Sequence, residues 1–273
     1  MKDDRIHRAI SVDGTQIVGS IDGHGPAIVL VPGGPADGPT SFRFLVPELM
    51  RDFTCHSMSP RGRGASAGHP DRSIERLVDD VVAYVDSLDG PVTLFGHSSG
   101  GVLALEAAAR CDAVAALVLY EPAVFDGLDE TESARLVQSV ATARRAVEEG
   151  AWARAAEVFF RELALGNEEE LEGLEAAGMY QFWAYNIPGL LQEIDTSGLP
   201  GLTAPDIPER VPVPALVLYG TRTAPFYEHV ARSLVDRFAD GRLAPVEGAG
   251  HLGPQYHASA VAERVRSLAP VPA

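Results

Sequence analysis

The pattern of apolar and polar positions divides the chain into two strand-rich parts separated by a helical middle. Residues 27–31 (AIVLV) and 215–219 (ALVLY) are apolar at every position, which is typical of central parallel strands buried on both faces. Further short apolar runs predict strands at 54–58, 92–95, 115–120 and 242–246. Segments of helical periodicity alternate with them at 41–51, 74–88, 102–110, 227–238 and 259–268. This alternation predicts βαβ units and a mostly parallel central sheet flanked by helices.

The first residues of the chain predict a β-hairpin. Residues 5–12 and 16–21 have strand character, and they flank the dipeptide Asp13-Gly14. Asp-Gly between two such runs is a strong hairpin signal, because both residues tolerate the positive φ of a tight turn.

Residues 126–208 contain no strand-like run. Helices are predicted at 129–149, 151–165, 168–180 and 181–193, the last interrupted by Pro188-Gly189. We expect this block to be a helical lid inserted after the strand at 115–120, because insertions on a rigid scaffold often carry function. The core domain would then comprise residues 1–125 and 209–273. The alternative is a helical subdomain with no part in the site.

Composition and charge narrow the class of protein. The net charge of −16 and a pI of about 4.8 disfavour binding to nucleic acid or to anionic membranes. Cys55 and Cys111 are too few for a disulfide framework, so we expect two buried thiols. The sequence shows no signal peptide and no apolar run of about 18 residues. We therefore expect a cytoplasmic protein with a small-molecule ligand.

The strongest chemical motif is GHSSG at residues 96–100. It fits G-x-S-x-G, in which a sharp strand-to-helix turn raises a serine hydroxyl above the sheet. Here the motif follows the strand VTLF and opens the helix VLALEAAAR, which is the context that this motif requires. The pattern indicates Ser98 as a nucleophile, and the alternative is a glycine turn without chemistry.

The neighbouring backbone predicts an oxyanion hole. Ser98 is expected at a helix N-terminus, where unpaired N–H groups favour negative charge, so the N–H of Ser99 is one candidate donor. The loop PGGP at 32–35 follows the strand 27–31, and Gly33 or Gly34 can bring a second N–H close. The alternative for this loop is a tight turn without a ligand.

A base must activate the serine, and neutral imidazole suits that role near neutral pH. The chain has eight histidines. His251 follows the last predicted strand in the segment GAGH, which is the place and the chain order that a serine nucleophile of this type requires. His97, beside the nucleophile, is expected to line the pocket or to pack.

Four motifs in this order resemble the α/β-hydrolase superfamily, and the resemblance covers nearly the whole chain. They are the loop PGGP at 32–35, the segment RGRGAS at 61–66, the elbow GHSSG at 96–100 and the segment GAGH at 248–251. The resemblance implies an α/β-hydrolase fold with a Ser-His-acid triad. It implies much less about the substrate.

The acid of the triad departs from the common pattern. In most relatives an acid follows the strand that here is 215–219, but the corresponding position is Thr223. Glu121 ends the strand at 115–120, at the edge of the sheet where active sites gather. Some haloalkane dehalogenases and the fungal zearalenone lactone hydrolases have their acid there, and Ser98 excludes the Asp-nucleophile chemistry of the former. Glu121 is the preferred acid, and Glu228 is its rival.

These roles imply acyl transfer. His251 would take the proton of Ser98, and the N–H groups of Gly33 and Ser99 would hold the oxyanion. Glu121 would stabilise the imidazolium. No cofactor or metal is expected.

The predicted lid also suggests where a substrate binds. A cluster of aromatic residues lies at the end of one predicted lid helix. We expect this cluster either to cover an apolar substrate or only to pack against the core. The expected substrate contacts are Gly34, His97, Leu128, Trp183 and Tyr185.

We expect an enzyme that cleaves a carboxylic ester or a lactone, with a macrolactone such as zearalenone as one candidate substrate. The alternatives are a C–C hydrolase, a perhydrolase or a natural-product lyase on the same scaffold, or a ligand-binding protein with a degenerate site. Homodimers are common on this fold, but the sequence leaves the oligomeric state open.

Overall fold

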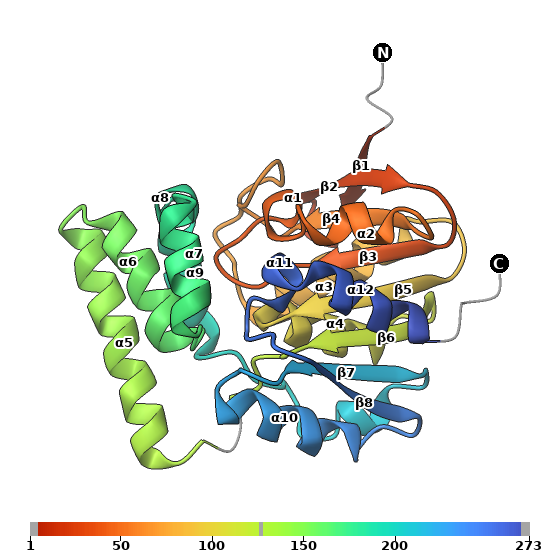
Figure 1. Ribbon diagram of the computed structural model, residues 1–273. Coiled ribbons are helices and arrows are strands. Elements are labelled where there is room, and N and C mark those ends of the chain that lie inside the picture. The colour runs from red at the N-terminus through yellow and green to blue at the C-terminus, as the bar shows by residue number, and fades with distance from the viewer. Residues whose placement is uncertain (1–4, 126–127, 269–273) are drawn as a thin grey trace.

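A single eight-stranded sheet organises the molecule. The computed structural model describes residues 5–125 and 128–268, and the strand order is β1-β2-β4-β3-β5-β6-β7-β8 (Figure 1). The strands are β1 (Ile6–Ile10), β2 (Gln16–Gly23), β3 (Ala27–Val31), β4 (Thr54–Ser59), β5 (Val92–His97), β6 (Val114–Tyr120), β7 (Ala215–Gly220) and β8 (Gly241–Val246). Only β2 pairs antiparallel with its neighbours β1 and β4, so the predicted hairpin and the mostly parallel sheet are confirmed.

Helices cover both faces of the sheet, because its central strands are apolar on both sides. One buried cluster joins the sheet to α3 (Ile74–Asp86), α4 (Ser99–Ala108) and α10 (Pro225–Val235). A second cluster joins the other face to α2 (Leu45–Leu49) and α12 (Ala258–Ser267). The short helices α1 (Gly38–Ser41) and α11 (Gly253–Tyr256) lie in the loops after β3 and β8. Cys55 and Cys111 are buried free thiols, as expected.

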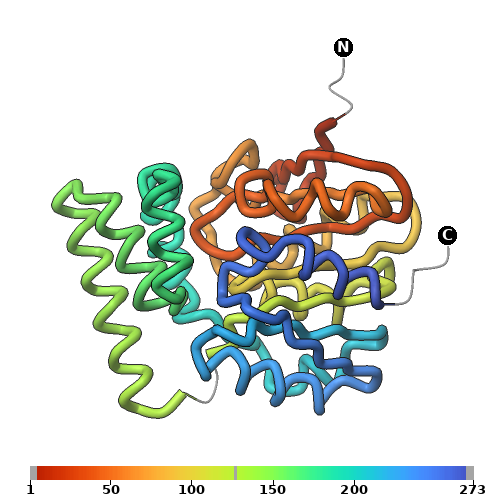
Figure 2. The backbone as a smooth tube through the Cα atoms, viewed as in Figure 1, coloured from red at the N-terminus to blue at the C-terminus, as the bar shows by residue number. Residues whose placement is uncertain are grey.

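Between β6 and β7 the chain forms a block of helices with its own apolar cluster. These helices are α5 (Glu130–Glu148), α6 (Trp152–Val158), the π-helix η1 (Phe159–Leu163), α7 (Glu168–Ala176), α8 (Met179–Ala184) and α9 (Ile187–Ser197). The block lies at one end of the sheet (Figures 1 and 2). The 3₁₀-helix η2 (Pro208–Arg210) then precedes β7. We call residues 130–197 the helical insert.

Two predicted helices divide differently in the structure. Of the predicted helix 41–51, only residues 45–49 are helical, as α2, while Ser41 is the last residue of α1. The break expected at Pro188-Gly189 lies instead between α8 and α9, at residues 185 and 186. Pro188 occupies the first turn of α9, where a proline costs no hydrogen bond because that N–H has no partner within the helix.

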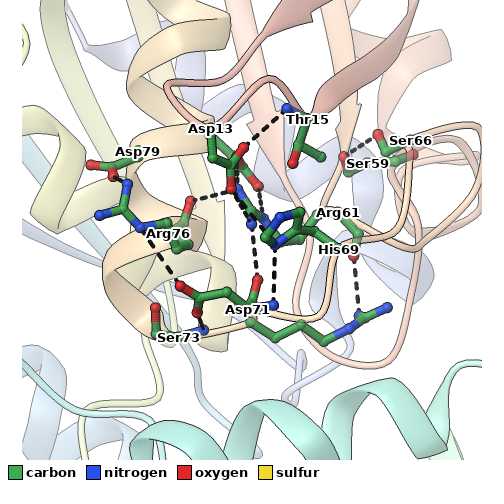
Figure 3. A network of polar contacts seen from close by, with 12 residues as sticks. Asp13, Thr15, Ser59, Arg61, Ser66, His69, Asp71, Ser73, Arg76 and Asp79 are labelled. Atoms are coloured by element: carbon green, nitrogen blue, oxygen red, sulfur yellow. Dashed lines mark hydrogen bonds and ion pairs between the residues drawn. The ribbon is translucent and has the colours of Figure 1, made fainter.

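A buried ion-pair network fixes the loop after β4 (Figure 3). Arg61 is fully buried, and its guanidinium donates to Asp80 at 2.6 and 2.7 Å and to Asp13 at 2.8 Å. Asp13 belongs to the hairpin turn and Asp80 to α3, so Arg61 joins three segments that are far apart in the sequence. Arg72 donates in turn to the carbonyl of Arg61. The network holds the loop at residues 61–64 in place. This loop contacts the helical insert through the ion pair of Arg63 with Glu193.

Among the described residues, no helix combines the length and the apolar character that crossing a membrane requires.

Candidate active site

Ser98 lies on a strained turn between β5 and α4. Its φ of 55° and ψ of −126° are outside the regions that most residues adopt. The turn brings α4 against the end of β3: a Cβ on Gly100 would lie 2.4 Å from the carbonyl oxygens of Val31 and Pro32. Gly100 is therefore required for this approach, and the turn lifts the Ser98 side chain to the carboxyl ends of the strands.

His251 and Glu121 form a buried pair beside Ser98. Nδ1 of His251 lies 2.8 Å from Oε2 of Glu121, and both side chains are almost completely inaccessible to solvent. Glu121 directly follows β6, and His251 follows β8 in the sequence. β6 and β8 both flank β7 in the sheet, so two residues that are 130 apart in the sequence meet at the carboxyl ends of the strands.

Two donors from the segment after β7 hold the Glu121 carboxylate. The N–H of Gly220 donates to Oε1 and the hydroxyl of Thr223 donates to Oε2, each at 2.8 Å. The sequence placed Thr223 at the usual acid position. The structure shows that this threonine binds the carboxylate that comes from the neighbouring strand.

Burial controls the protonation of the pair. It raises the pKa of Glu121 to about 8, against the hydrogen bonds from Gly220 and Thr223, which lower it. Burial also lowers the pKa of His251 far below its usual range. The imidazole is therefore neutral at rest and available to accept a proton.

The rival acid lies elsewhere. Glu228 is on the outer side of α10, its side chain is 44% exposed, and it pairs with Arg232 at 2.8 Å one helical turn away. The structure therefore brings Glu121, and not Glu228, to His251.

The backbone around His251 is held by side chains from two neighbouring strands. Nε2 of His97 lies 2.8 Å from the carbonyl oxygen of His251, and the hydroxyl of Tyr120 donates to the carbonyl of Gly250 at 2.7 Å. His97 therefore contacts the histidine loop, although it also lines a cavity at Ser98. The sequence does not indicate this role for Tyr120, because the residue ends an apolar run that predicts only a buried strand.

Tyr227 of α10 packs directly on the imidazole ring of His251. Its ring stacks on His251 with the centroids 4.2 Å apart, and its hydroxyl lies 3.5 Å from Nε2. The hydroxyl donates to the carbonyl of Ala164 in the insert at 3.2 Å. Burial raises the pKa of Tyr227 well above its usual value, so the phenol remains neutral.

The predicted oxyanion donors surround the same serine. Ser99 is the first residue of α4, and Gly33 lines a cavity together with Ser98. The N–H of Gly34 donates a hydrogen bond to the hydroxyl oxygen of Ser99 at 2.9 Å. Within the described part of the chain, the N–H of Gly33 has no such acceptor, which favours Gly33 over Gly34.

Two cavities touch Ser98. One is lined by Gly33, Gly34, His97, Trp183 and His251, among others. The other has an apolar wall that includes Phe125, Phe159, Leu163, Leu190 and Tyr227. Helices of the insert therefore form part of both walls.

The structure does not bring every predicted contact to the site. Trp183 does line one of the cavities at Ser98, where it is buried against Phe160 and its indole N–H donates to Thr40. Tyr185 is 76% exposed and lies against Trp152 instead. Tyr185 directly follows α8 and keeps helical backbone geometry, and residues two apart in this geometry point to opposite sides. Leu128 is partly buried before α5 and is not among the side chains that line these cavities.

In the described ranges 5–125 and 128–268, no group of three or more His, Cys, Asp or Glu side chains is placed to hold a metal ion.

A serine raised between a parallel strand and a helix, beside a buried histidine–carboxylate pair, is the arrangement of nucleophile-elbow proteins on an α/β sheet. The chain belongs to one family of this class: a sequence profile of the alpha/beta hydrolase family matches residues 28–264.

Individual relatives show the same fold. An alpha/beta hydrolase from Sphaerobacter thermophilus superposes with a TM-score of 0.77 at 25% identity, over 95% of this chain and 100% of that chain. The enol-lactonase from Burkholderia xenovorans gives a TM-score of 0.75 at 24% identity, over 96% and 98% of the two chains. Lipase LipV from Mycobacterium tuberculosis is 40% identical over 103 residues, which cover 34% of this chain and 39% of LipV.

Proposed function

We propose that the chain is a serine hydrolase that cleaves a carboxylic ester or a lactone through an acyl-enzyme on Ser98. The observation that carries this proposal is the buried His251–Glu121 pair, joined at 2.8 Å, next to a serine on a strained turn. The partial match to a lipase agrees with ester chemistry.

The mechanism begins with proton transfer from Ser98 to Nε2 of His251 as the serine oxygen attacks the carbonyl carbon. The N–H groups of Gly33 and Ser99 bind the oxyanion, and Glu121 stabilises the imidazolium. His251 then protonates the leaving alcohol. A water molecule, deprotonated by His251, then attacks the acyl carbon. His251 returns this proton to the oxygen of Ser98 as the acid leaves.

The substrate is proposed to be a small apolar ester or lactone. The cavity walls next to Ser98 are mostly aliphatic and aromatic, and a pocket of this kind gains affinity by covering apolar surface. We propose that the helical insert acts as a lid, because Trp183, Leu190 and Phe159 contribute to the walls. A macrolactone such as zearalenone would test how far this lid opens.

Hydrolysis of a panel with Ser98→Ala as control tests the proposal. The panel contains p-nitrophenyl acetate and butyrate, γ-butyrolactone and zearalenone. Turnover of at least one ester or lactone that is lost in Ser98→Ala supports the proposal. Equal rates for the two proteins, or silence across the panel, would refute it and favour lyase chemistry or a binding protein.

A further inference from the structure

The carboxyl group of Glu170 lies on the loop that carries the proposed base. Glu170 belongs to α7 of the helical insert and is buried. Its Oε1 accepts hydrogen bonds from the N–H of Gly250 at 3.2 Å and of Leu252 at 3.0 Å. These are the residues on either side of His251, so one oxygen holds both flanking amides.

The local sequence places this side chain. Asn167 caps α7, and its Oδ1 accepts the N–H of Glu170 three residues later. In a capping box the glutamate would turn back to the cap residue. Here its carboxylate leaves the helix and binds the histidine loop.

Gly250 permits this approach. A Cβ at this position would lie 2.2 Å from Nδ2 of Asn167 and 2.7 Å from Oε2 of Glu170. The glycine before His251 therefore lets the N-terminus of α7 contact the loop.

We propose that Glu170 is a positioning residue that couples docking of the helical insert to the orientation of His251. The proposal rests on the proposed function, in which His251 is the base. With Glu170 in place, the N–H groups on both sides of the histidine are fixed, while Glu121 holds Nδ1 and His97 contacts the carbonyl. Withdrawal of α7 would release this backbone, so the base is fully ordered only when the insert is docked.

The ionisation of Glu170 should affect that of Glu121, so its charge can be followed through the pH dependence of the reaction. Burial, and then repulsion from Glu121, raise the pKa of Glu170 to about 7, against the hydrogen bonds from the backbone. Tyr120 and Tyr256 are the other titratable side chains that sense its charge. Oε2 is buried without a hydrogen-bond partner among the described residues. Because the two carboxylates repel each other, neutralising Glu170 should make Glu121 easier to ionise.

The experiment compares Glu170→Gln with Glu170→Leu, using p-nitrophenyl butyrate from pH 5 to 10. The amide oxygen of glutamine still accepts both N–H groups, so kcat should stay within a few-fold of wild type. The acid limb of kcat/KM should move to lower pH. Leucine removes the acceptor, and we expect kcat to fall about 10²-fold with little change in KM, because a small misplacement of a catalytic group costs that much. Glu169→Leu, at an exposed neighbour, is the matched control.

A wild-type kcat in a folded Glu170→Leu enzyme would overturn the proposal. Thermal unfolding establishes whether that variant folds; if it does not, an unchanged acid limb in Glu170→Gln overturns the proposal instead. If wild type shows no Ser98-dependent hydrolysis, the proposed function fails by itself. The positioning role is then decided by the downfield proton NMR signal of His251 Nδ1–H, assigned with His251→Ala. This signal should persist in Glu170→Gln and be lost in Glu170→Leu, and its equal persistence in both would refute the role.

Discussion

Replacing Glu121 with glutamine should disable the enzyme while leaving its shape intact. The carboxylate accepts three hydrogen bonds at 2.8 Å, from Gly220, Thr223 and His251. An amide of the same size can replace only part of this arrangement. Its NH₂ group cannot accept the Nδ1 proton, so the wrong tautomer of the imidazole is favoured and the imidazolium is no longer stabilised.

The size of the loss follows from that argument. The same acid-to-amide exchange in a serine protease triad lowers kcat by about 10⁴, which corresponds to about 5.4 kcal/mol of transition-state stabilisation. The assay is kcat for the best substrate of the panel. Glu228→Gln is the control, because Glu228 forms only an exposed i,i+4 ion pair and its loss should change kcat less than twofold. Similar, mild effects of the two substitutions would refute the assignment of Glu121.

Three further outcomes are expected. Thr223→Val removes a donor that lowers the pKa of Glu121, so this pKa should rise and the acid limb of kcat/KM should move to higher pH; an unchanged limb contradicts this role. Arg61→Met leaves the buried carboxylate of Asp80 unpaired and should cost about 3–5 kcal/mol in urea unfolding, whereas a loss below 1 kcal/mol would show that the network is dispensable. Trp183→Ala enlarges the cavity at the nucleophile and should raise the ratio of octanoate to acetate ester turnover, whereas Tyr185→Ala, at an exposed position, should leave that ratio unchanged.

The fold could be predicted from the sequence because its signals are local. Fully apolar runs indicate buried parallel strands, and the motif GHSSG carries the backbone requirements of its own turn. Ser98, His251 and Glu121 each end or follow a predicted strand, so the parallel sheet itself explains why they meet.

The remaining parts of the site depend on contacts that no local pattern encodes. Thr223 and Tyr227 contact Glu121 and His251 only because β6, β7 and β8 are neighbours in the sheet. Glu170 lies in the first turn of the predicted helix 168–180, and no local pattern there indicates a contact with the histidine loop. The aromatic character of Trp183 and Tyr185 predicts the same role for both, although Trp183 on α8 is buried and Tyr185, which follows α8, is exposed.

The most direct test of the central claim is the rate at which a fluorophosphonate modifies Ser98, measured by intact mass and located by peptide mapping. We expect one label per chain, on Ser98, formed at least about 10²-fold faster in wild type than in His251→Ala, because the hydroxyl needs its base to react. Labelling of Ser98 at the same slow rate in both proteins, or labelling elsewhere that persists in Ser98→Ala, would contradict an activated serine at this site.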